Sequence, residues 1–191
     1  MDGQQVKPLA DERALVVQAQ AGDHEAFVVL MERHLKEVFN LCLRYLGHRQ
    51  DAEDMTQETF VRAYQHLWAF DPERPFRNWV MTIAIRLCID RLRRRRPQQP
   101  LEHPEYDEAW LADPAPSPED MALRYEQVQR IQRLIQRLPP LERALVVLHY
   151  WEGYRYEELA QALQLSVSAV KSRLFRARRK LLTYWMEEEA S

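Results

Sequence analysis

Residues 155–174, "RYEELAQALQLSVSAVKSRL", have the outline of two short helices joined by a turn. Ala160 is small enough to let two helices cross closely, and Ser166 can accept a hydrogen bond from the free N–H groups that begin the second helix. Apolar residues at helical spacing would form the contact between the helices: Leu159, Leu163, Leu165, Val170 and Leu174. The pattern therefore predicts a helix-turn-helix.

Two positions of this motif depart from the usual pattern. Gln164 occupies the turn position at which glycine commonly supplies a positive φ, and a residue with a side chain there costs about 1 kcal/mol. Arg155 stands where a serine or threonine helix cap is more usual. Neither departure removes the apolar contact pattern, so the prediction of a helix-turn-helix remains.

The second helix of the motif is strongly basic. Residues 171–180 contain six lysine and arginine side chains and no acid, although the whole chain has 29 acidic against 27 basic residues. A solvated face on a structural helix would explain such a cluster, and so would a helix that enters the major groove of DNA. Because the cluster follows a helix-turn-helix pattern, we favour DNA contact.

A charge boundary divides the rest of the chain. Residues 86–96 hold six arginines and one aspartate, whereas residues 97–120 hold seven acids, six of the eleven prolines and no Lys or Arg. Proline stops helices and repeated acids repel, which is typical of an extended linker. We expect an N-terminal domain over residues 1–96, an acidic Pro-rich linker over 97–120 and a C-terminal domain over 121–191.

Both domains show helical periodicity. In the N-terminal domain, apolar residues recur at helical spacing after Asp23, a suitable N-cap, and again in segments that start near Asp51 and near Arg77. In the C-terminal domain, an apolar stripe from Tyr125 to Leu138 precedes Pro140, which suits a first helical turn. The expected fold is all-α, with two small helical domains.

Composition limits the classes of protein. A hydrophobic fraction of 46% and a charged fraction of 29% are typical of a soluble globular chain. We read no signal peptide at the N-terminus and no apolar run long enough for a membrane span, and we expect a cytoplasmic protein. Cys42 and Cys88 fall in apolar helical patterns and are expected to be buried free thiols. No cofactor, metal site or small-molecule substrate is predicted.

Residues 51–60, "DAEDMTQETF", are rich in acids. Asp54, Gln57 and Glu58 lie at helical spacing and share one face. A metal or acid–base site, the ordinary preference of a helix N-terminus for acids, and a docking face for a basic partner would all use this pattern. No histidine or second carboxylate cluster with ligand spacing accompanies the acids, which disfavours catalysis.

The segment that follows mixes aromatic and basic residues. Trp68, Phe70, Phe76 and Trp79 precede the arginine-rich residues 86–96. Aromatic faces beside cationic grooves hold unpaired nucleic-acid bases, but core aromatics beside a solvated charge run look the same in sequence. The residues alone leave both interpretations open.

Three blocks, taken in this order, carry a resemblance to a known family: "DAEDMTQETFVRAY", "RNWVMTIAIRLCIDRLRRRRP" and "LPPLERALVVLHYWEGYRYEELAQALQLSVSAVKSRLFRARRKL". Together they cover most of residues 22–182. The chain resembles the extracytoplasmic-function (ECF) group of bacterial RNA polymerase sigma factors, the small subunits that give the polymerase its promoter specificity.

The resemblance implies roles for particular residues. Asp54, Gln57 and Glu58 would dock on the clamp helices of the largest catalytic subunit of core RNA polymerase. The unpaired minus-10 strand of promoter DNA would be captured by Phe70, Phe76, Arg77, Asn78, Trp79, Arg86 and Arg91. The minus-35 duplex would be contacted by Ser168, Lys171, Ser172, Arg173 and Arg176.

The resemblance also implies regulation and shows one departure. The family often has Asn at the position of Arg86, so this chain differs where minus-10 bases are chosen. Members are typically held inactive by an anti-sigma factor, often membrane-anchored, and we expect such a partner. The acidic linker would lie in the polymerase channel towards the RNA exit path.

Two other classes of function would use only part of these blocks. A stand-alone helix-turn-helix transcriptional regulator would leave the acidic face and the aromatic-arginine block without a role. A metal-dependent nuclease would use Asp51, Glu53, Asp54 and Glu58, and would lose its activity to a chelator. A sigma factor, which is a binding protein with no catalysis of its own, accounts for all three blocks.

Overall fold

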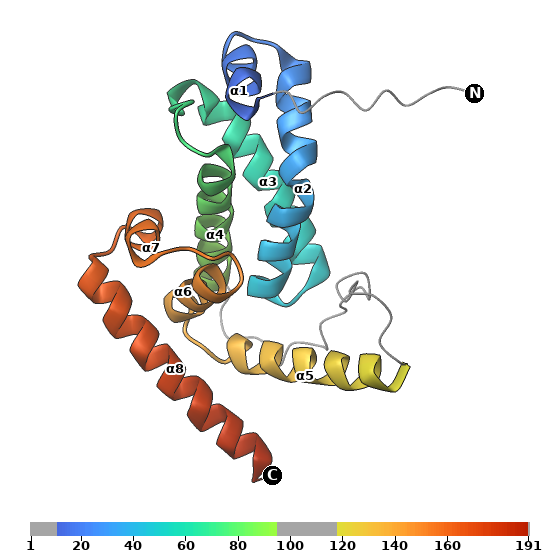
Figure 1. Cartoon of the computed structure of the whole chain (residues 1–191), viewed down its shortest axis with the longest axis vertical. Coiled ribbons are helices and arrows are strands. Elements are labelled where there is room, and N and C mark those ends of the chain that lie inside the picture. The colour runs from blue at the N-terminus through green and yellow to red at the C-terminus, as the bar shows by residue number, and fades with distance from the viewer. Residues whose placement is uncertain (1–10, 95–117, 191) are drawn as a thin grey trace.

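A computed structural model describes residues 11–94 and 118–190, and for residues 118–125 it describes the backbone alone. This part of the chain forms eight α-helices and one 3₁₀ turn, with no β-strand (Figure 1). The prediction of an all-α fold is confirmed. None of the helices in the described ranges is both long enough and apolar enough to cross a membrane.

The N-terminal half is built around three long helices that lie side by side, α2, α3 and α4 (Figure 1). Asp23 caps α2 as predicted, because its carboxylate accepts hydrogen bonds from the N–H groups of Glu25 and Ala26. Gly47 ends the same helix with φ 74°, a left-handed conformation that suits glycine. The elements are α1 (Glu12–Gln20), α2 (His24–Leu46), α3 (Arg49–His66), the 3₁₀ turn η1 (Leu67–Ala69) and α4 (Phe76–Arg94).

Helix α1 precedes the first helix expected from the sequence. Asp11 caps it, and it packs on α2 through Leu15, Val16 and Ala19, which are all buried. Its Glu12 carboxylate also accepts a hydrogen bond from the backbone N–H of Phe76, at 3.0 Å. Helix α1 therefore holds the start of α4 in place.

The C-terminal half consists of four helices. Helix α5 begins at Pro118, so residues 118–120 of the predicted linker are helical, and the rest of that linker lies outside the described residues. Pro140 opens α6, as expected from its fixed φ. The elements are α5 (Pro118–Gln136), α6 (Pro140–Tyr150), α7 (Tyr156–Leu163) and α8 (Val167–Glu189).

Helices α7 and α8 form the predicted helix-turn-helix. Gln164 takes the left-handed conformation, with φ 55° and ψ 47°, and ends α7. The hydroxyl of Ser166 accepts a hydrogen bond from the N–H of Ala169 at 3.1 Å, which caps α8. Leu159, Val170 and Leu174 are buried between the two helices as expected, while Leu163 and Leu165 are partly buried against the same core.

The two cysteines lie together in the N-terminal core. Cys42 on α2 and Cys88 on α4 are fully buried free thiols with their sulfurs 3.6 Å apart, which confirms the expectation of free, buried cysteines. Burial, together with the neighbouring Cys42, raises the pKa of the Cys88 thiol well above its usual value. The pair packs as small apolar side chains between the two helices.

The two halves of the molecule pack against each other. Helix α6 contacts α2 and α4, and α7 contacts α4, while α8 extends away from the N-terminal helices (Figure 1). The carbonyl groups at the C-terminal end of α2 are satisfied from the C-terminal half: Gln132 donates to the carbonyl of Arg44, and Arg143 donates to that of Tyr45 at 3.0 Å. The hydroxyl of Tyr45 in turn donates to the carbonyl of Pro140 at 2.8 Å. These bonds join the end of α2 to α5 and α6.

Candidate docking and nucleic-acid interfaces

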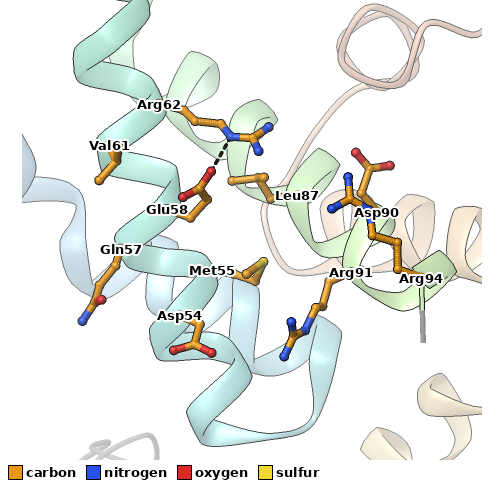
Figure 2. A pocket seen from close by; sticks show the side chains of 10 residues that line it. All are labelled: Asp54, Met55, Gln57, Glu58, Val61, Arg62, Leu87, Asp90, Arg91 and Arg94. Atoms are coloured by element: carbon orange, nitrogen blue, oxygen red, sulfur yellow. Dashed lines mark hydrogen bonds and ion pairs between the residues drawn. The ribbon is translucent and has the colours of Figure 1, made fainter. Parts of the chain in front are cut away.

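A surface groove lies between α3 and α4, with a volume of about 660 Å³ (Figure 2). All three residues predicted to dock on the polymerase line it: Asp54 and Gln57 are exposed, and Glu58 is half-buried. Helix α4 supplies the other side of the groove through Leu87, Asp90, Arg91 and Arg94. The structure thus brings the three predicted residues together at the edge of one groove.

The groove has mixed charge rather than a purely acidic surface. Arg62 donates to Glu58 at 2.7 Å one helical turn away, and Arg91 and Arg94 face the groove from α4. Met55 and Leu87 supply an apolar strip between the charged rims. Such a groove suits a partner helix that carries both basic and apolar side chains. No group of residues in the described ranges has the spacing of a metal site.

The aromatic residues before and in α4 form one packed cluster. Phe70 stacks on Trp79 with ring centroids 4.6 Å apart, and Phe76 lies 5.5 Å from Trp79. Phe76 is fully buried and Phe70 is nearly so, whereas Trp79 is half-buried. Phe76 therefore supports the cluster from inside, and Trp79 is the ring of the three that is most open to solvent.

Beside this cluster lies a second cavity, of about 850 Å³. Residues of both halves of the molecule line it, because α7 and the turn before it close its far side. The N-terminal half contributes Phe70, Arg74, Asn78, Trp79, Thr82 and Arg86, and the C-terminal half contributes Tyr154, Arg155, Glu158, Gln161 and Ala162.

Arg77 and Asn78, at the start of α4, bond to acids. Arg77 donates to Glu37 at 2.8 Å and to Glu152 at 2.8 Å, and Asn78 donates to Glu158 at 3.4 Å. Burial by itself would lower the pKa of Arg77, but the carboxylates of Glu37 and Glu152 outweigh it, so the pKa of this guanidinium is raised. Arg77 is thus held firmly in its cationic form.

The two later arginines differ in their surroundings. Arg86 is exposed and donates from Nε to the carbonyl of Ala162 on α7, at 2.9 Å. Arg91 donates to the buried carboxylate of Asp51 on α3, at 2.9 Å, and so joins α3 to α4. Arg86 lies at the cavity with the aromatic cluster, whereas Arg91 lies at the groove between α3 and α4.

The predicted recognition helix presents its basic face to solvent. Ser168, Lys171, Ser172 and Arg176 are exposed along the first half of α8, and Arg173 is half-buried. The second half has a different role at one position, because Lys180 donates to the nearly buried Glu142 of α6 at 2.7 Å. The first half of α8 is the part that a DNA groove could receive.

Sequence reasoning missed the residues that join the two halves at this site. Arg44, Glu152 and Glu158 contact the predicted minus-10 residues or lie beside them. Their sequence separations of 75 to 108 residues leave no periodic signal, and ordinary surface charges look the same in a sequence.

Two family models match the chain and define its class. The model for sigma-70 region 2 matches residues 30–98, which include the α3–α4 groove and the aromatic cluster. The model for sigma-70 region 4 matches residues 128–181, which include the helix-turn-helix. Regions 2 and 4 in one chain define an RNA polymerase sigma factor.

Similar proteins give the finer assignment. The ECF RNA polymerase sigma factor SigW of Bacillus subtilis is 34% identical, over 87% of this chain and 92% of its own length. The RNA polymerase sigma-H factor of Pseudomonas aeruginosa is 35% identical, over 87% of this chain and 90% of its own length. The chain belongs to the ECF family of RNA polymerase sigma factors.

Solved structures agree with this fold. CnrH, solved in complex with the cytosolic domain of CnrY, is 32% identical and aligns with a TM-score of 0.66 over 93% of this chain and 99% of CnrH. The sigma factor RpoE of Bartonella quintana, solved with the anti-sigma factor NepR, shares the fold with a TM-score of 0.60 at 18% identity, over 83% of this chain and 94% of RpoE.

Proposed function

We propose that the two halves of this sigma factor bind different targets. Residues 1–96 would bind core RNA polymerase and the minus-10 strand, residues 97–120 would form an acidic linker, and residues 121–191 would bind the minus-35 duplex. The observation that carries this proposal is the placement of the predicted docking residues in one exposed groove, apart from the exposed basic face of α8. A stand-alone regulator has no use for that groove.

Core polymerase would dock in the groove between α3 and α4. Asp54 and Glu58 supply negative charge at its α3 edge, and Met55 and Leu87 supply apolar area. A helix of the polymerase with basic residues beside apolar ones would satisfy both features.

The minus-10 strand would lie along the start of α4. Trp79 offers a ring for a base, while Arg77, Asn78 and Arg86 offer cationic and amide donors to phosphates or base edges. Phe70 and Phe76 would act through Trp79, because both are buried beneath it. Arg91 would contribute charge from the groove side, where Asp51 holds it.

The minus-35 duplex would receive α8. Ser168, Lys171 and Ser172 lie near its N-terminal end, the end that enters the major groove in helix-turn-helix proteins. Arg173 and Arg176 would follow along the groove, where an arginine can bind guanine through two hydrogen bonds.

We also propose the setting in which the protein works. Sigma factors act on polymerase in the cytoplasm, and we place this chain there, without catalysis of its own. An anti-sigma factor would hold it inactive, which is supported by the complex of the similar CnrH with the cytosolic domain of CnrY.

Run-off transcription tests the proposal. The purified chain is mixed with core RNA polymerase and a pool of templates that carry randomised minus-35 and minus-10 blocks, and the transcripts are sequenced. We expect enriched motifs in both blocks and a defined start site, with neither feature for core polymerase alone. Transcripts without enrichment in either block would overturn the proposed function. A motif bound without polymerase and without transcripts would instead support the stand-alone regulator.

A further inference from the structure

Helix α1 contacts both η1 and α4 and is bonded to the backbone on either side of the loop between them. The side-chain Nε2 of Gln20, at the C-terminal end of α1, donates to the backbone carbonyls of Leu67 and Phe70, each at 2.8 Å. Near the other end of α1, the Glu12 carboxylate accepts a hydrogen bond from the N–H of Phe76 at 3.0 Å. Two side chains of α1 thus hold both ends of this loop.

The loop itself, residues 71–75, forms one side of the cavity beside the aromatic cluster. Asp71, Arg74 and Pro75 line that cavity. Within the loop, the N–H of Arg74 donates to the carbonyl of Asp71 at 3.0 Å and closes a turn. This internal bond shapes the loop, whereas the bonds from α1 fix where the loop lies relative to α4.

The same two side chains of α1 act on the aromatic cluster. Gln20 holds the backbone of Phe70, whose ring stacks on Trp79 with centroids 4.6 Å apart. Glu12 holds the N–H of Phe76, which opens α4 and has no partner within that helix. The ring of Phe76 lies 5.5 Å from that of Trp79. Both phenylalanines that support Trp79 are therefore tied to α1.

The Glu12 carboxylate is fixed in its turn by α2. The Nε2 of His34 lies 3.1 Å from the second carboxylate oxygen of Glu12, and it donates this bond because an ionised carboxylate only accepts. The His34 side chain is only 10% exposed, so this contact is sheltered from water. Arg13 and Glu73 also join α1 to the loop, but their side chains are 59% and 64% exposed, and such pairs contribute little. The bonds of Glu12 and Gln20 are the ones that position the loop.

We propose that Glu12 and Gln20 are positioning residues for recognition of the minus-10 strand. Neither touches the DNA. They hold the loop and Trp79 in one relative arrangement, and a site held rigidly in this way accepts fewer base sequences than one that shifts. The inference rests on the proposed function, and it extends minus-10 recognition to a helix outside residues 30–98, which match region 2.

The first experiment measures base selectivity in transcription. The template pool with randomised minus-35 and minus-10 blocks is transcribed by core polymerase with the unsubstituted chain, Gln20→Leu or Gln18→Leu. Gln20→Leu removes both donors, whereas Gln18→Leu makes the same change at an exposed glutamine of α1. We expect Gln20→Leu to lower motif enrichment in the minus-10 block about fivefold or more, because two hydrogen bonds are lost. Enrichment equal to that of Gln18→Leu would overturn the inference.

The minus-35 block separates positioning from a general loss of structure. We expect its enrichment to stay unchanged in Gln20→Leu, because α8 lies in the other half of the chain. Equal losses in both blocks would indicate a poorly folded sigma factor and would also overturn the inference. If the unsubstituted chain enriches neither block, the proposed function fails and the inference fails with it.

Glu12 provides a second pair of variants, which decides the question if Gln20→Leu does not fold. Glu12→Gln keeps an oxygen that can accept from the N–H of Phe76, and Glu12→Ala does not. We expect minus-10 enrichment to fall in the alanine variant and to stay within about twofold of the unsubstituted chain in the glutamine variant. Equal losses in the two variants would contradict positioning through this hydrogen bond.

Hydrogen exchange tests the same bonds without polymerase or DNA. In Gln20→Leu, the backbone N–H groups of residues 70–74 should exchange at least about tenfold faster than in the unsubstituted chain, because exchange reports local opening. Gln18→Leu should leave these rates unchanged. Mass spectrometry of the exchanged chain measures the rates. Unchanged exchange in a folded Gln20→Leu chain would overturn the inference even where transcription supports the proposed function.

Discussion

Gln164 differs from the glycine that is usual at this turn position, yet it adopts the backbone conformation that the turn requires. Its φ of 55° ends α7 in the left-handed conformation, as the turn requires, and the N–H of Leu165 returns to the carbonyl of Ala160 at 2.9 Å. The backbone hydrogen bond that closes the turn is therefore made. Glutamine in place of glycine affects stability only through the backbone strain of its positive φ.

Replacing this residue should stabilise the protein. Gln164→Gly removes the Cβ that disfavours a positive φ, and we expect the free energy of unfolding to rise by up to about 1 kcal/mol. Thermal unfolding measures the change. Gln161→Gly, inside α7, should have the opposite sign because glycine weakens a helix interior. Equal effects of the two changes would show that strain at residue 164 is absent.

Arg173 and Arg176 are the residues of α8 with the clearest expected role in base recognition. Arg173→Ala and Arg176→Ala, made separately, should each weaken binding of the polymerase-bound sigma factor to its minus-35 duplex by roughly 1 to 3 kcal/mol if the arginine contacts a base through two bonds. Anisotropy with matched and mutated minus-35 duplexes measures this loss. Arg49→Ala on α3 is the control, with affinity expected to stay unchanged. A loss of the same size on every duplex sequence would indicate a phosphate contact in place of base recognition.

At the scale of elements, the end of α2 depends on side chains from far along the chain. Arg143 on α6 donates to the carbonyls of Tyr45 and Leu138 and to the side chain of Gln136. The side chain of Arg143 is nearly excluded from solvent, and this burial lowers the pKa of its guanidinium. Helix α2 thus ends against the C-terminal half rather than in water.

Removing this arginine should destabilise the junction. Arg143→Met keeps the apolar stem but leaves buried carbonyls without donors, and we expect a loss of about 2 to 4 kcal/mol in the free energy of unfolding. Urea unfolding measures it. Arg137→Met, at an exposed arginine paired with Glu187, should cost less than about 1 kcal/mol. A loss at Arg143 no larger than at Arg137 would mean that the junction is open in solution.

The elements also show what a sequence pattern can predict. The helix-turn-helix, the cap at Asp23 and the burial of the two cysteines follow from local spacing, and all three are confirmed. The apolar stripe predicted from Tyr125 to Leu138 is only partly buried, because Leu134 and Leu138 are covered while Val128 and Ile131 are exposed. Periodicity identifies an apolar face but not whether another element covers it.

At the scale of the whole molecule, the contact between the halves is the feature that could not be predicted from the sequence. Glu152 gives no signal in a chain where acids are common, and its importance comes from Arg44 and Arg77, which lie far from it in the sequence. Asp54, Gln57 and Glu58 could be proposed as docking residues from the sequence because they share one helix face and resemble a family motif. Residues brought together only by the packing of two domains have no such local pattern.

The central claim is that the α3–α4 groove attaches this sigma factor to core RNA polymerase. The direct measurement is the affinity of fluorescently labelled chain for core polymerase, with Asp54→Lys and Glu58→Lys combined. The control reverses two exposed acids of α2, Glu25→Lys with Glu32→Lys, and circular dichroism verifies that both variants keep their helices. We expect a loss of at least about 100-fold for the groove variant, since reversed charges oppose a basic partner, and little change for the control. Equal affinity of the groove variant and the unsubstituted chain would contradict the claim.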